Sequence, residues 1–194
     1  MTDGSSLSPR PTRRRAGRLA LGLACLGMAG LGGLPARAKT PGEVPIGQVL
    51  PEVMMLGLNG PKRPLSSFRG KALIINVWAS WCGPCRQEMA SLERLAWRES
   101  AVPFAIFGIS TDDYPEKAKA LLRATNATLS HFIDHDLELE QMLGATRLPL
   151  TVLVDAQGRV LRKVVGAQEW DSPASIEMIT NTFRSSRRPS TTRR

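Results

Sequence analysis

An almost unbroken apolar run, Ala72–Trp78, lies near the middle of the chain. Such a run is typical of a strand that is buried on both faces of a sheet. The period then changes, because apolar residues recur at spacings of three and four from Met89 to Ala96. This spacing predicts a helix with one buried stripe that reaches about Glu99. The pattern therefore predicts a buried strand followed closely by an amphipathic helix.

The remaining apolar segments continue an alternation of strands and helices. We expect a small hairpin first, then further elements in the order given by these ranges: Val53–Leu58 and Pro64–Phe68 (hairpin), Phe104–Ile109 (strand), Pro115–Thr125 (helix), Leu137–Leu143 (helix), Leu150–Val154 and Val160–Val165 (hairpin), and Pro173–Phe183 (helix). The order β-α-β-α, then a β-hairpin, then a helix requires a mixed sheet with helices on both faces. The fold class is therefore α/β, with an additional hairpin on its N-terminal side.

Residues 1–38 have the pattern of an export signal. Five arginines between Arg10 and Arg18 precede an apolar, glycine-rich stretch from Leu19 to Leu34, and Ala36–Ala38 offers a cleavage site between small residues. The apolar stretch is shorter than the roughly 20 residues that span a bilayer. We expect either a signal peptide cleaved after Ala38 or an uncleaved N-terminal membrane anchor, and in both cases a periplasmic domain.

Charge and composition divide the rest of the chain. The net charge of +9 comes from residues 1–39 (+6) and residues 184–194 (+5), whereas the body between them carries −2. A basic face for nucleic acid is therefore not expected. Residues 39–52 are interpreted as a linker, 53–184 as the folded domain and 185–194 as a disordered basic tail. The tail favours peripheral membrane association through anionic lipids, in addition to any anchor.

Three cysteines are present, and Cys25 lies in the export signal. The other two, Cys82 and Cys85, are separated by two residues. A disulfide across so short a loop stabilises little, which favours a redox role over a structural one. A zinc site would need a second ligand pair. His131 and His135 are more simply interpreted as surface histidines, so we expect no metal site.

The dithiol lies where the buried strand turns into the helix. Backbone N–H groups at a helix N-terminus stabilise a thiolate, which lowers the pKa of the first cysteine. Cys82 is therefore expected to attack a client disulfide, and Cys85, one turn into the helix, to resolve the mixed disulfide. Pro84 fixes the turn between them.

The segment Trp78–Cys85 resembles the active-site sequence of thioredoxin. Four further segments are similar to the TlpA/ResA branch of exported thioredoxins: Asn76–Trp78, Arg86–Met89, Thr151–Gly158 and Gly166–Trp170. The resemblance covers about residues 50–183. It implies a thioredoxin-like fold with the early hairpin as an N-terminal extension.

The resemblance also points to Glu88. Thioredoxins carry a buried aspartate where this chain has Asn76, which does not titrate, whereas the TlpA/ResA branch has an acid near the active site at the position of Glu88. We expect Glu88 to accept or relay a proton when Cys85 must ionise. The alternative is a solvent-facing acid that complements the helix dipole.

Substrate-binding residues are expected on both sides of the dithiol. Trp81, Gly83 and Pro84 flank or separate the cysteines, and Leu148–Pro149 resembles the cis-proline loop that packs against the dithiol in this fold. Without the resemblance, Pro149 would be a proline at the start of a strand. The family usually has a smaller or β-branched residue at position 148, so Leu148 bears on client specificity.

We therefore expect an exported protein-disulfide reductase, a monomer without cofactor. The resemblance implies that a membrane thiol donor regenerates the dithiol. It also suggests clients among the copper-centre proteins of cytochrome oxidase, with apocytochrome c before haem attachment as the alternative. Two more distant alternatives are a copper-binding chaperone that uses the same cysteines and a thiol peroxidase.

Overall fold

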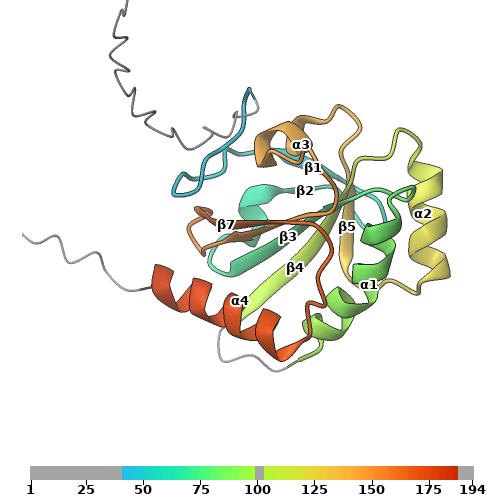
Figure 1. The fold of residues 1–194 in the computed structure, drawn as a ribbon. Helices are drawn as coiled ribbons and strands as arrows, with labels where there is room; N and C mark the ends of the chain where they lie inside the picture. Colours follow the sequence, from blue (N-terminus) through green and yellow to red (C-terminus); the bar gives the residue numbers. More distant parts are fainter. Residues whose placement is uncertain (1–40, 99–102, 188–194) are drawn as a thin grey trace, which may run out of the picture. The chain divides into compact units, whose positions relative to one another are not determined.

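The computed structural model describes residues 41–98 and 103–187, which form a mixed seven-stranded sheet in the order β2-β1-β5-β4-β3-β6-β7 (Figure 1). At its centre, β3 pairs in parallel with β4 and antiparallel with β6. The strands are β1 (Met54–Gly57), β2 (Arg63–Pro64), β3 (Ala72–Trp78), β4 (Phe104–Ser110), β5 (Ser130–Ile133), β6 (Leu150–Val154) and β7 (Val160–Val165). The predicted α/β class with a mixed sheet is confirmed.

Helices cover the sheet because β3 is apolar on both faces. Leu73, Ile75 and Val77 pack with the side chains of α3 on one face. Ile74 and Trp78 point to the other face. There Ile74 packs with side chains of α1 and α4, and Trp78 packs with side chains of α1 and α2. The helical elements are the short 3-10 helix η1 (Leu65–Phe68), α1 (Gly83–Ala96), α2 (Pro115–Ala124), α3 (Glu138–Leu143) and α4 (Pro173–Ser186).

The predicted N-terminal hairpin is present and extends the sheet, but its second strand is only Arg63–Pro64. Leu65–Phe68, predicted as part of that strand, form the 3-10 helix η1 instead. β1 pairs antiparallel with β2, and its other edge pairs antiparallel with β5. The sequence pattern had not identified β5 as a strand of its own. This short strand joins the hairpin to the central strands, because it also runs parallel to β4.

Two helix ends differ from the prediction by more than one residue. α1 ends at Ala96, with Trp97 as its C-cap, whereas the apolar stripe suggested about Glu99. α4 continues to Ser186, so the first residues assigned to the disordered tail are helical. The rest of that tail beyond Arg187, and the export signal at 1–38, lie outside the described residues.

Residues 41–52, interpreted from sequence as part of a linker, instead pack on the domain. Three backbone hydrogen bonds of 2.8–2.9 Å join residues 47–50 to residues 158–160 at the start of β7. Leu50 is 1% exposed and belongs to the apolar core. The pattern of Pro and Gly in this segment reflects turns against the domain, and the folded unit begins earlier than residue 53.

His131, expected on the surface, is buried in β5. Its Nδ1 accepts a hydrogen bond of 3.1 Å from Nε1 of Trp78, and the two rings lie edge to face. Gly108 on the neighbouring strand makes room for the pair, because a Cβ there would clash with both rings. Burial lowers the pKa of His131 to about 4. His135, in contrast, is exposed.

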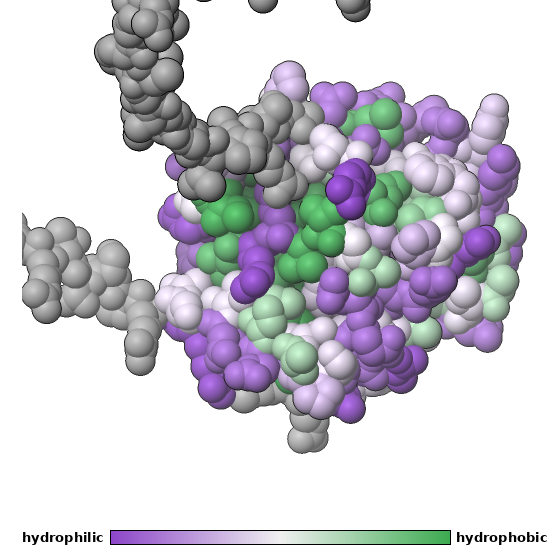
Figure 2. Space-filling model, in the orientation of Figure 1, coloured by the Kyte–Doolittle hydropathy of each residue, from purple (hydrophilic) through white to green (hydrophobic). Residues whose placement is uncertain are grey.

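The visible surface is largely polar, with apolar residues gathered in a few separate areas (Figure 2). Trp81 is among the most exposed large apolar side chains, with 69% of its surface accessible. Within residues 41–98 and 103–187, no helix combines the length and the hydropathy that a membrane crossing needs.

The buried His131 predicts an acid-sensitive stability. Its pKa is 6.5 in an ordinary setting and about 4 in the folded protein. Between these values the unfolded chain binds a proton that the folded protein excludes. The free energy of unfolding therefore falls as the pH falls through this window, by at most about 3 kcal/mol.

His131→Asn should flatten this slope, because an amide oxygen can accept from Trp78 without titrating. Urea unfolding of both proteins from about pH 7 to about pH 4 measures the difference. The carboxylates are common to both proteins and cancel in the comparison. Parallel curves would contradict the assignment to His131.

Candidate active site

Cys82 and Cys85 lie at the N-terminus of α1, one short loop after β3. Cys82 is the N-cap residue, and its Sγ accepts a hydrogen bond of 3.2 Å from the backbone N–H of Cys85. The two cysteines form a disulfide with an S–S distance of 2.01 Å. Cys82 is 5% exposed and Cys85 is fully buried, so a partner reaches Cys82 first.

Asp112 holds the loop before the dithiol in place through hydrogen bonds to Ser80. This buried carboxylate accepts hydrogen bonds from the backbone N–H of Ser80 at 2.8 Å and from the hydroxyl of Ser110 at 2.7 Å. It also accepts from the Ser80 hydroxyl at 2.5 Å. Sequence reasoning missed Asp112. Its bonds hold the backbone next to Trp81, whose ring remains exposed beside Cys82.

Glu88 is only 1% exposed, so it is not the solvent-facing acid of the alternative interpretation. Its Oε1 accepts from the side-chain amide of Asn76 at 2.7 Å. Its Oε2 accepts from the backbone N–H of Gln168 at 3.1 Å and from Nε1 of Trp170 at 3.0 Å. Burial raises the pKa of Glu88, although the three donors act in the opposite direction.

Asn76 joins this carboxylate to the sheet. Its amide also donates to the hydroxyl of Thr151 on the adjacent strand, at 3.0 Å. Asn76 and Thr151 are directly paired in the β3–β6 register, so their side chains lie on the same face. The single polar residue in the apolar run of β3 thus faces Glu88.

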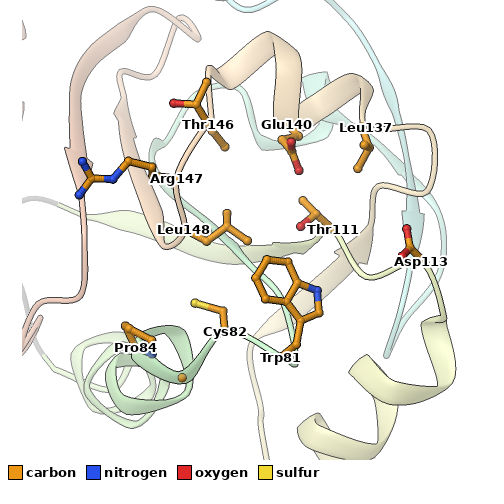
Figure 3. A pocket seen from close by; sticks show the side chains of 12 residues that line it. Trp81, Cys82, Pro84, Thr111, Asp113, Leu137, Glu140, Thr146, Arg147 and Leu148 are labelled. Carbon is orange, nitrogen blue, oxygen red and sulfur yellow. The ribbon is translucent and has the colours of Figure 1, made fainter.

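A cleft of about 650 Å³ opens beside Cys82. Four of the expected substrate-binding residues line it: Trp81, Gly83, Pro84 and Leu148. In Figure 3 the Cys82 sulfur lies below Leu148, and the Trp81 ring lies to its right. Pro149 is buried behind this lining, and the Leu148–Pro149 peptide bond is cis.

The cleft has lining residues that the sequence did not indicate: Thr111, Asp113, Leu137, Glu140, Ala145, Thr146 and Arg147. Most come from the loop after β4 and from α3 with the loop that follows it. In Figure 3 the Glu140 carboxylate points into the hollow, whereas the Arg147 guanidinium points away from it. Partial burial raises the pKa of Glu140. No residue-type pattern in the sequence connected these segments to the dithiol.

The two histidines weighed as metal ligands are not part of the cleft. His131 is buried in β5, where it accepts the hydrogen bond from Trp78, and His135 is exposed in the loop before α3. Among the residues that the structure describes, no three His, Cys, Asp or Glu side chains come together as a metal site would require.

A model of the Redoxin family matches residues 45–178, which includes the cysteines, Glu88 and the cis-proline loop. The chain belongs to the Redoxin family. Within it, this Redoxin protein is a TlpA/ResA-like thiol–disulfide oxidoreductase, as the resemblance had implied.

Curated relatives and solved structures agree. ResA of Bacillus thuringiensis is 27% identical over 126 residues, which are 65% of this chain and 73% of the relative. DsbE of Pseudomonas aeruginosa is 36% identical over 132 residues, 65% of this chain and 71% of that one. A crystal structure from Chlorobium tepidum, assigned as a DsbE protein, has the same fold, with a TM-score of 0.64 at 24% identity over 74% of this chain and 98% of that one.

Exposure and helix position predict that Cys82 reacts first. Iodoacetamide added to the reduced Redoxin protein near neutral pH should modify Cys82, because the helix N-terminus stabilises its thiolate. Peptide mapping by mass spectrometry identifies the modified residue. Predominant modification of Cys85 would reverse the roles assigned to the two thiols.

Proposed function

We propose that this Redoxin protein is an exported protein-disulfide reductase, in which Cys82 attacks, Cys85 resolves and Glu88 accepts the proton of Cys85. The observation that carries this proposal is the pairing of a cysteine that lines the cleft with a fully buried one, which lies three residues before a buried carboxylate. Side chains three residues apart on a helix are neighbours. The chain thus has a base on the inner side of the dithiol and a client cleft on the outer side.

The reaction is an exchange of two electrons in two displacements. The Cys82 thiolate attacks one sulfur of the client disulfide, that bond breaks, and the other client sulfur leaves as a thiolate that takes up a proton. Cys85 then gives its proton to Glu88 and attacks Cys82. The second client sulfur leaves and is protonated, so the client becomes a dithiol while Cys82 and Cys85 form a disulfide.

Glu88 suits this task because burial raises its pKa toward that of a thiol, which makes it a better base than an exposed carboxylate. Asn76 binds the carboxylate but does not titrate. Of the two side chains, only Glu88 can hold the proton of Cys85. The proton returns to the client or to solvent after the second displacement.

Glu88→Gln should slow client reduction by about 10- to 100-fold, because the amide cannot take up the proton. The fold should be retained, since rotation of the Asn76 amide lets its oxygen accept from the new Gln. Stopped-flow reduction of a model disulfide measures the rate.

Glu93→Gln is the matched control for this prediction. It alters a carboxylate on the same helix that binds Thr128 instead of the dithiol region. Equal rates for Glu88→Gln and the unmodified protein from about pH 5 to about pH 9 would leave Glu88 with a structural role only.

The client remains part of the proposal. The similarity to the TlpA branch in residues 166–170 supports a copper-centre protein of cytochrome oxidase, and apocytochrome c is the second candidate. A membrane thiol donor would restore the dithiol after each cycle. We also propose that the protein is periplasmic and associates with the membrane through its N-terminal segment or its basic tail.

Cys85→Ser should trap the client. Without Cys85 the mixed disulfide between Cys82 and the client cannot be resolved, so it accumulates. Purification from cells under non-reducing conditions, followed by mass spectrometry, identifies the partner. The double variant that also carries Cys82→Ser is the control and should capture nothing. Recovery of a copper-centre protein supports the first client, recovery of an apocytochrome supports the second, and equal recovery with the control variant would contradict the mechanism.

A further inference from the structure

One side of α1 holds the segment 168–171 at three successive positions. Glu88, Ser91 and Arg94 are spaced three residues apart, which places them along one face of the helix. Glu88 accepts from both Gln168 and Trp170, as described above. Ser91 accepts from the backbone N–H of Trp170 at 3.0 Å and lies 3.3 Å from the Gln168 carbonyl oxygen.

Arg94 completes this contact at the surface. Its Nε and Nη2 donate to the two oxygens of Asp171 at 2.6 and 3.0 Å, and Nη2 also binds Glu169. The Arg94 side chain is 53% exposed, whereas that of Asp171 is only 14% exposed. Exposed ion pairs usually contribute little to stability, but a bidentate arginine–carboxylate pair within a network of charges contributes more.

The 168–171 segment is therefore held on two sides. On its buried side Trp170 is fully buried and packs with Leu92 and Leu95 of α1. On its surface side the Arg94 guanidinium forms ion pairs with Glu169 and Asp171. Two of the three hydrogen-bond donors to Glu88 lie on this short stretch, and the carboxylate that they bind is buried.

We propose that Arg94 is a positioning residue for the proton transfer at Glu88, acting through the 168–171 segment. This proposal rests on the proton-accepting role proposed for Glu88. When the Arg94 contacts are lost, the segment lifts more often. Water then reaches the Glu88 carboxylate and replaces the hydrogen bonds from Gln168 and Trp170.

The consequence for Glu88 has a definite direction. Burial is the largest cause of its raised pKa, so entry of water moves that pKa down toward the ordinary value. A weaker base accepts the proton of Cys85 less well. Release of the segment therefore slows resolution of the mixed disulfide and shifts its pH dependence to lower pH.

A chromogenic aryl disulfide separates the two displacements, because each one releases a coloured thiolate. The first release reports attack by Cys82 and the second reports resolution by Cys85. The second phase is measured across pH for the unmodified protein and for Arg94→Met, Glu88→Gln and the double variant. Arg98→Met is the matched control, since the Arg98 side chain has no ion pair among the described residues.

Arg94→Met should slow the second phase by about 3- to 10-fold, within the usual size of such couplings, and lower the midpoint of its acid limb. Arg98→Met should match the unmodified protein. In the Glu88→Gln background, Arg94→Met should have no further effect on this phase. Urea unfolding verifies that each variant is folded at the pH of assay.

A midpoint that does not move in Arg94→Met would overturn the proposal. The same slowing with and without Glu88 would also overturn it, because Arg94 would then act on stability or on the thiols directly. A separate outcome is that Glu88→Gln itself leaves the second phase unchanged. That result would remove the proposed role of Glu88, and with it the basis for the role of Arg94.

Discussion

The carboxylate of Glu88, a residue of α1, is buried against β3 and the 168–171 segment, and both donate hydrogen bonds to it. An ionised group in such a place is costly unless its hydrogen-bonding capacity is filled. The chain meets this requirement with one side-chain amide, one backbone N–H and one indole N–H. The sheet, the helix that starts at the dithiol and the chain entering α4 are thereby joined at one point. The same burial that has to be compensated gives the carboxyl its affinity for a proton.

The two sides of the dithiol differ in the way they are built. On the inner side, Trp78, Met89 and Cys85 are packed with little exposure, and Glu88 lies among fixed partners. On the outer side, Cys82 faces a cleft whose walls come from loops and the short α3. Loops vary more readily than a packed core, so the walls of the cleft can change in sequence while the surroundings of the sulfur atoms stay the same.

The sequence predicted the features that depend on local pattern. The apolar run 72–78 predicted the central strand, and the spacing of apolar residues after Cys82 predicted the helix. The position of the two cysteines between them predicted that the dithiol lies at the helix N-terminus. It did not predict β5, because four residues that include a serine and a histidine carry too little signal. It also did not predict that Gln168 and Trp170 donate to Glu88, since these residues meet it only when the segment 168–171 folds back on α1. The role of residues 41–52 was misread because turns against a domain and turns in a linker share the same residues.

The segment 47–50 has a consequence for how the sheet ends. β7 is the last strand in the order, and an unpaired edge strand offers its backbone to other chains. Residues 47–50 occupy the beginning of that edge. Further along β7, Lys163 forms an ion pair of 2.6 Å with Glu43, which places charge beside the strand. The edge of β7 is thus paired at its beginning and carries charge further along, and both features disfavour aggregation through strand addition.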